Sequence, residues 1–213
     1  MLDILQDLKK AVLEGDDERA LKLVQSALQQ GIKPEALVNQ AIMPGIQEAG
    51  ELWKKNIYFQ SDVIMSAEAF RVAMGVVEPL LTAGEAVGSK KIAIGTVAGD
   101  MHNLGKIIVI AMLRGAGFNV TDLGEDVPMH AFIDTVKIQK PDILGLGCYM
   151  TTTMLEMKEV LKNLNDSGLR GQVKVMIGGV PTSQEFAEEI GADGWGKDAL
   201  DAVSKAKKLV GVS

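Results

Sequence analysis

An acid and a histidine stand two residues apart in the segment GDMHNLG, directly after an apolar run. Asp100 and His102 follow the run KIAIGTV, which is typical of a buried strand, and Gly105 closes the turn. A neutral imidazole is the most common metal ligand in proteins, and its second nitrogen usually donates to a carboxylate. The pair therefore has the composition of a metal ligand with its supporting acid. A loop histidine beside a helix-capping aspartate has the same sequence, and this alternative stays open.

His102 has few candidate partners as a metal ligand elsewhere in the chain. The sequence holds two histidines and one cysteine, and their scattered positions do not make a zinc site. We expect Cys148 to be a small buried strand residue, and His130 to be a surface residue at the start of a helix. A single protein ligand is enough only where the metal brings its other ligands with it, as in a macrocycle.

The composition excludes several classes of function. The chain has 22 Lys and Arg against 28 Asp and Glu, a net charge of −6, which disfavours nucleic acid as a partner. It has no G-x-G-x-x-G after the first strand and no phosphate-binding loop motif, so a dinucleotide or a nucleotidase activity is not expected. The single cysteine fits a reducing compartment, and no apolar run approaches the roughly 20 residues of a membrane span. We expect a cytoplasmic protein with no membrane partner.

The periodicity of apolar residues divides the chain into two parts. Helical spacing prevails up to residue 81, where we predict four helices, with Asp16 or Asp17 capping the second, Pro34 opening the third, Pro44 kinking it and Ser61 capping the fourth. The polar segment Thr82–Lys91 reads as a linker and a hinge. We therefore predict an N-terminal four-helix bundle in residues 1–88.

The second part, residues 89–213, alternates five short strands with helices. The strands are predicted in the runs KIAIGTV, NVTDLG, DILGLGCYM, VKVMIGG and DGWG. This order is typical of an α/β domain with a doubly wound, five-stranded parallel sheet, Rossmann-like or flavodoxin-like. Ligands of such sheets bind at the carboxyl ends of the strands, where the loops GDMHNLG, GCYMTTTM and GGVPTS are expected to meet.

With these loops in place, the chain resembles the cobalamin-binding domains. The segment GDMHNLG matches their D-x-H-x-x-G signature, the pair Gly178–Gly179 matches their later glycine motif, and the helical part resembles the cap of methionine synthase. A chain with only these two domains looks like a corrinoid protein of anaerobic methyltransferase systems.

The resemblance implies a cobalamin or related corrinoid bound base-off and His-on, with His102 as the lower cobalt ligand and Asp100 as its supporting acid. The displaced nucleotide tail would run between the first, third and fourth strands. Trp53 and Val63 of the cap would cover the upper face, whereas Gln60 stands where methionine synthase has an aliphatic residue. The remaining implied contacts are Met101, Asn103, Leu104, Gly105, Gly147, Thr151, Thr153, Gly178, Gly179 and Asp198.

One position departs from the family pattern. The family often has S-x-L after the third strand, with the serine extending the Asp–His relay, and the matching residues here are Gly147, Cys148 and Tyr149. Without that hydroxyl, we expect the relay to end at Asp100, or to pass to water or to a threonine such as Thr151.

The implied function is that of a methyl carrier rather than a complete enzyme. A donor-specific methyltransferase would load the methyl group onto cobalt, a second methyltransferase would pass it to a folate or a thiol, and a reductive activation protein would keep the cobalt active. Two alternatives are a cobalamin-binding sensor or regulator and the cobalamin subunit of a mutase. The regulator would need a DNA-binding module that the sequence does not show, and the mutase subunit gives no reason for a helical cap.

Overall fold

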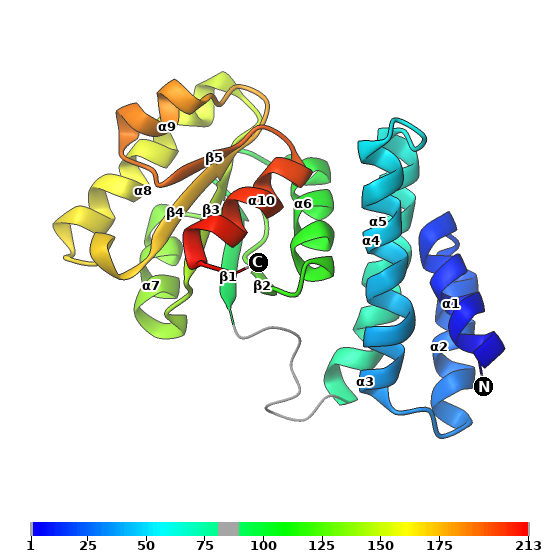
Figure 1. Cartoon of the computed structure of the whole chain (residues 1–213). Coiled ribbons are helices and arrows are strands. Elements are labelled where there is room, and N and C mark those ends of the chain that lie inside the picture. The colour runs from blue at the N-terminus through cyan, green and yellow to red at the C-terminus, as the bar shows by residue number, and fades with distance from the viewer. Residues whose placement is uncertain (1, 81–89, 213) are drawn as a thin grey trace. The chain divides into compact units, whose positions relative to one another are not determined.

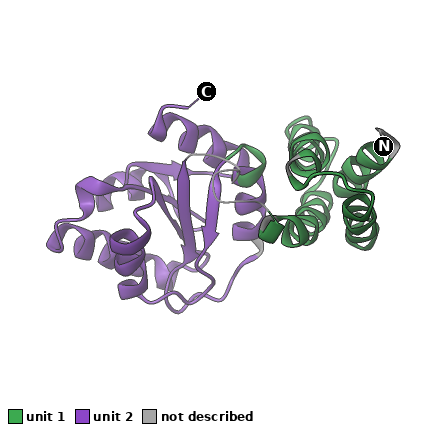
Figure 2. Cartoon of the chain, turned by 90° about the horizontal axis from the view of Figure 1, so that it is seen from below, with its two compact units in different colours: residues 1–87, 114–117 green, residues 88–113, 118–213 purple. Residues whose placement is uncertain are grey.

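The computed structural model describes residues 2–80 and 90–212 of the chain (Figure 1). It divides into two compact units, residues 1–87 with 114–117 and residues 88–113 with 118–213 (Figure 2). The predicted linker, Thr82–Lys91, lies outside the described residues except for its last two positions.

The N-terminal unit is helical, as the apolar spacing predicts. Helix α1 packs against α2 and α4, and α5 packs against α1, α2 and α4. The buried faces carry apolar residues at helical spacing, among them Leu8, Val12, Val24 and Ile46. Asp16 caps α2 by accepting the backbone N–H of Arg19. The long helices are α1 (Leu2–Glu14), α2 (Asp17–Gln29), α4 (Met43–Lys54) and α5 (Gln60–Val77).

The third predicted helix is interrupted just before Pro44. A short helix, α3 (Pro34–Leu37), continues into a π-helical turn, η1 (Val38–Ile42), in which the N–H of Met43 donates to the carbonyl of Val38. Proline lacks an N–H, and its ring would clash with the carbonyl four residues earlier in a regular helix. The wider turn gives the ring room, and α4 begins directly after it. The η2 turn (Glu78–Leu80) follows α5.

The predicted cap of the fourth helix is corrected by two residues, from Ser61 to Phe59. Helix α5 begins at Gln60, before Ser61, and the carboxylate of Asp62 accepts the backbone N–H of Phe59 at 2.7 Å. The Asp62 side chain therefore reaches back to the backbone N–H of the residue before the helix, and Ser61 lies inside the first turn.

The C-terminal unit is a parallel sheet in the order β2-β1-β3-β4-β5, which confirms the doubly wound fold. The described strands are β1 (Lys91–Thr96), β2 (Asn119–Asp122), β3 (Ile143–Gly147), β4 (Lys174–Gly178) and β5 (Gly194–Gly196). Between and after them lie α6 (Leu104–Gly115), α7 (Met129–Gln139), η3 (Thr151–Thr153), α8 (Met154–Asp166), η4 (Arg170–Gln172), α9 (Gln184–Ile190) and α10 (Ala199–Val210).

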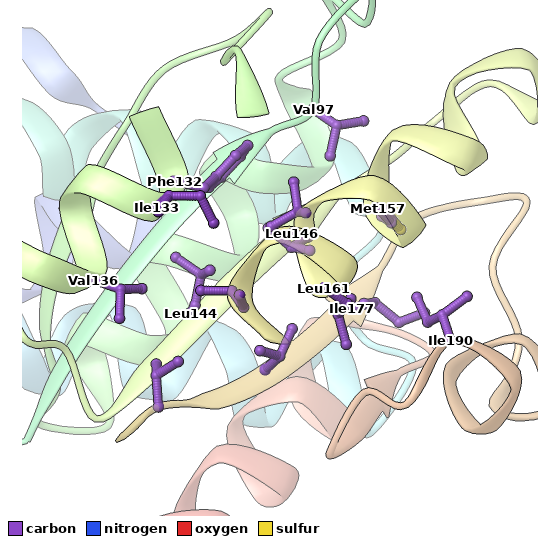
Figure 3. Close-up of a cluster of buried hydrophobic side chains, with 14 of the residues drawn as sticks. Val97, Phe132, Ile133, Val136, Leu144, Leu146, Met157, Leu161, Ile177 and Ile190 are labelled. Carbon is purple, nitrogen blue, oxygen red and sulfur yellow. The ribbon is translucent and has the colours of Figure 1, made fainter. Parts of the chain in front are cut away.

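The two faces of this sheet differ in their side chains. On one face, β1, β3 and β4 pack apolar side chains against α7, α8 and α9, with Leu146, Phe132, Leu161 and Ile177 among them (Figure 3). The opposite face is the side of α6 and α10, as Figure 1 shows. Because side chains alternate along a strand, the next residue of each strand points to this second face.

A row nearly free of side chains crosses the second face near the carboxyl ends of the strands. Thr96 of β1 pairs in register with Gly147, Gly147 with Gly178, and Gly178 with Gly196. Three neighbouring strands thus present only backbone at this level. A side chain at Gly196 would meet Ala202 of α10 at 2.9 Å, so α10 already lies close to the backbone there.

Candidate functional site

Asp100 is the fixed centre of the loop after β1. Its side chain is fully buried, and its Oδ1 accepts the N–H of His102 at 3.1 Å and faces His102 Nδ1 at 2.8 Å. Its Oδ2 accepts the backbone N–H groups of Tyr149 at 2.7 Å and Met150 at 3.1 Å, both from the loop after β3. Helix α6 begins only at Leu104, so Asp100 joins two loops and does not cap that helix.

The missing hydroxyl of the relay is present, but on another residue. Thr153 Oγ1 donates to Asp100 Oδ2 at 3.0 Å and is buried, whereas Thr151 is exposed. Of the three expected outcomes, an end at Asp100, water or a threonine such as Thr151, the structure shows a threonine, and it is Thr153 instead of Thr151. The η3 turn explains why Thr153 and not Thr151 makes this bond, because the turn buries the third threonine of TTT. Cys148 is buried, and its sulfur lies 3.2 Å from the same hydroxyl oxygen.

These contacts keep Asp100 ionised. Burial by itself raises the pKa of a carboxyl group, but hydrogen bonds from Tyr149 N–H, His102 and Thr153 outweigh it and hold the pKa of Asp100 below its ordinary value. An ionised Asp100 accepts a hydrogen bond from Nδ1–H of a neutral His102 ring, and in this tautomer Nε2 keeps its lone pair. The His102 side chain is 60% exposed, so this nitrogen is accessible to a ligand.

Thr96, the last residue of β1, holds the backbone of His102. The hydroxyl of Thr96, which is fully buried at the end of β1, donates to the His102 carbonyl at 3.0 Å. His102 is thereby held through its ring nitrogen, its backbone N–H and its backbone carbonyl.

The loop after β2 braces the same turn from the other side. Asp126 accepts the N–H of Gly99 at 2.7 Å, and its own N–H donates to the Asp100 carbonyl at 3.1 Å. Asp126 has φ 51°, in the left-handed region that aspartate tolerates better than most residues. Buried Lys106, in the first turn of α6, pairs with Asp122 and with Glu125 at 3.2 Å.

The sequence reasoning missed this brace, although one signal was available. Glu125 and Asp126 follow the predicted strand NVTDLG, and the carboxyl ends of parallel strands share one edge of the sheet. The same rule that gathered the other three loops places this loop at their edge of the sheet, but it does not predict the bond from Gly99 to Asp126.

Gly178 and Gly179 bring the loop after β4 against the loop after β3. The carbonyl of Gly178 accepts the N–H of Cys148 at 3.0 Å. A Cβ on Gly179 would stand 1.7 Å from the Cys148 carbonyl oxygen, and its φ is +117°. Position 179 therefore admits only glycine. The three loops that the sequence assigned to one edge do meet there.

Other predicted contacts lie at the rim or farther away. Met101 and Asn103 are exposed beside His102, and the side chain of Leu104 is outside the described part of the structure. Asp198 is the N-cap of α10 and accepts the N–H of Asp201 at 2.8 Å, so the structure gives it a capping bond. His130 is exposed at the second position of α7, as expected.

The two cap residues differ in exposure. Trp53, near the end of α4, is half-buried, whereas Val63 in α5 is fully buried in the bundle. The chain near them exposes Phe59 and Ile57, which the sequence reasoning did not single out. Contact of Trp53 or Val63 with a bound corrinoid stays a prediction.

The site suits a metal that carries most of its own ligands. Among residues 2–80 and 90–212, no three His, Cys, Asp or Glu side chains are grouped so that they could hold a metal ion. His102 offers one accessible nitrogen, and the glycine row beside it offers backbone that a flat or elongated group could approach closely. These residues fit a metal macrocycle with an appended tail. Within the same described ranges, no helix has the length and apolar character needed to cross a membrane.

Comparison with known families identifies the class. Residues 90–204 match a B12 binding domain model, and residues 4–78 match a second B12 binding domain model. The chain therefore belongs to the family of B12-binding corrinoid proteins.

Several relatives match this chain along nearly its whole length. The chain is 39% identical to a corrinoid protein of Desulfitobacterium hafniense, over 99% of both chains. It is 39% identical to trimethylamine corrinoid protein 1 of Methanosarcina mazei, over 96% of both chains. Among solved structures, it resembles a chain of the methanol:cobalamin methyltransferase complex of Methanosarcina barkeri, with a TM-score of 0.84 and 30% identity, over 99% of this chain and 81% of that one.

Proposed function

We propose that the protein binds its corrinoid with His102 Nε2 on cobalt and with the cofactor's own base displaced. The observation that carries this proposal is the buried Asp100 carboxylate, which faces Nδ1 at 2.8 Å and directs the accessible side of the ring outward. Two backbone N–H groups and Thr153 hold that carboxylate in turn. Such outer hydrogen bonds fix the tautomer and the orientation of a ligating imidazole.

The displaced nucleotide tail would lie along the glycine row under α6 and α10. Gly147 and Gly178 stand side by side in β3 and β4, and the open part of the row ends before Gly196, where Ala202 of α10 packs against the backbone. A tail that enters beside His102 would meet backbone there instead of side chains. Gly105, Thr151 and Gly179 remain candidate contacts at the mouth of this path.

The protein would then act as the methyl carrier of a methyltransferase system. A bound corrinoid supplies a cobalt centre that takes up and releases a methyl group. A donor-specific methyltransferase would load the group, a second methyltransferase would remove it to a folate or a thiol, and a reductive activation protein would restore the cofactor. The chain's own part is to hold, orient and shield the cofactor, which fits a protein that works through partners.

The similarity along the whole chain supports the carrier over the two alternatives. The relatives named as corrinoid proteins match both the helical part and the sheet. A regulator would be expected to bind DNA, which a net charge of −6 disfavours. A mutase subunit would not need the helical unit.

A transfer experiment tests the proposal. The protein is loaded with cobalamin, reduced, and incubated with its co-purifying methyltransferase and a panel of 13C-methyl donors: methylamines, methanol, glycine betaine and methoxylated aromatics. We expect one donor class to label the bound corrinoid, and a His102→Ala variant to lose most of this labelling. Co-purification with DNA and no labelling by any donor would favour the regulator instead.

A further inference from the structure

Tyr149 lies where the proposed tail path begins. Its backbone is fixed at the edge of the sheet, because its N–H donates to the buried Asp100 carboxylate at 2.7 Å. Its ring centroid stands 6.0 Å from that of His102, with the planes tilted by 37°. The ring is thus beside the cobalt ligand, at the mouth of the glycine row.

The ring occupies the space that two glycines leave free. A Cβ on Gly105 would stand 2.8 Å from both Cε1 and the hydroxyl oxygen of Tyr149, closer than side chains ever pack. A Cβ on Gly147 would stand 3.5 Å from Cε2, which is ordinary contact. The ring therefore bridges the first turn of α6 and the end of β3, and Gly105 is needed to admit it.

The far end of this side chain lies against the first turn of α6, where the hydroxyl oxygen would stand 2.8 Å from a Cβ on Gly105. Burial and the nearby Asp100 carboxylate raise the pKa of Tyr149, so it is a neutral phenol.

We propose that Tyr149 is a specificity residue of the cofactor site, whose ring must leave Gly105 and Gly147 before a nucleotide tail can lie there. The inference rests on the proposed His-on binding mode and adds a selective step to it. A corrinoid with a tail displaces the ring, whereas a corrinoid without one binds at His102 with the ring in place. The backbone of Tyr149 stays bound to Asp100 throughout, so the step needs only a side-chain rotation.

The test compares cobalamin with cobinamide, the corrinoid that lacks the nucleotide tail. Association rates and affinities are measured by absorbance for the wild type and for Tyr149→Leu, Tyr149→Ala and Tyr149→Phe. If the ring covers the path in about nine molecules of ten, its removal speeds cobalamin association about tenfold. We expect this gain in the Leu and Ala variants, a smaller gain in the Phe variant, and no change for cobinamide.

Two results would overturn the inference while leaving the proposed function intact. If the Leu and Ala variants bind cobalamin more weakly but cobinamide normally, Tyr149 supports the tail. If both corrinoids change by one factor, the ring acts on the macrocycle and not on the tail. A wild-type protein that binds neither corrinoid would overturn the proposed function and this inference together. Tyr149→Leu retains an apolar side chain of moderate size, which guards against collapse of the site in the Ala variant.

Discussion

The hydroxyl group that donates to Asp100 belongs to Thr153 and not to position 147, where the family often has a serine. Position 147 is glycine, yet Thr153 supplies a donor to Oδ2 at 3.0 Å from six residues farther on. The sequence contains three consecutive threonines, and only the geometry of the η3 turn decides which of them is buried. Residue type alone left the relay ending at Asp100 or passing to water or to a threonine such as Thr151, and did not single out Thr153.

Thr153→Val removes this hydroxyl while keeping the shape of the side chain. We expect the free energy of unfolding to fall by about 1–2 kcal/mol, because a buried carboxylate loses a donor. Chemical denaturation of the protein without corrinoid measures this change.

Thr151→Val is the matched control in the same turn. Thr151 is exposed, so its substitution should change stability by less than about 0.5 kcal/mol. Equal effects of the two substitutions would contradict the assignment of the relay hydroxyl to Thr153.

At the scale of elements, the loop after β2 holds the loop that carries His102, through bonds to Gly99 and Asp100. Asp126 accepts the Gly99 N–H at 2.7 Å and adopts φ 51°. Both features favour aspartate or asparagine, since each tolerates the left-handed region and offers an oxygen acceptor. The loop after β1 therefore depends on a neighbouring strand for its shape.

A series at position 126 separates the two features. Asp126→Asn should be nearly neutral, Asp126→Gly should lose the acceptor alone, and Asp126→Ala should lose the acceptor and strain the backbone, at a total of about 2 kcal/mol. Denaturation gives the order, and hydrogen exchange at the Gly99 amide reports the bond directly. If the Ala variant matched the Asn variant in both measurements, Asp126 would not be a brace.

The opposite edge of the sheet carries an ionic contact that sets its acid stability. Asp193, just before β5, accepts Arg170 at 2.7 Å and the backbone N–H of Val175 at 2.8 Å. Burial tends to raise the pKa of Asp193, but these bonds and Lys174 lower it below its ordinary value. The folded state thus binds this proton less readily than the unfolded chain does.

The sign of this shift predicts a pH dependence. The contribution of Asp193 is complete above the unfolded pKa of about 3.9, and is lost as the pH falls through the lower folded pKa. Asp193→Asn should therefore cost about 2 kcal/mol at pH 7 and progressively less below about pH 4. Urea denaturation at several pH values measures the difference, and a cost that does not change with pH would exclude a role for the charge.

At the scale of the whole chain, the architecture could be predicted from the sequence, whereas most contacts between the loops could not. Helical spacing up to residue 81 and the alternation of strands and helices after it are local patterns, and both parts fold as predicted. The brace by Asp126, the choice of Thr153 and the position of the Tyr149 ring depend on contacts between loops from different strands. Such contacts depend on how strands and turns pack, which residue spacing does not reveal.

The central claim is that His102 is the lower ligand of cobalt, and electron paramagnetic resonance tests it directly. The protein is produced with 15N-histidine, loaded with cobalamin, and studied in the cobalt(II) form. We expect the nitrogen splitting to change from a triplet to a doublet on labelling, and we expect this doublet to persist in His130→Ala and to be lost in His102→Ala. A triplet that labelling leaves unchanged would show that the cofactor's own base is on cobalt, and would contradict the account.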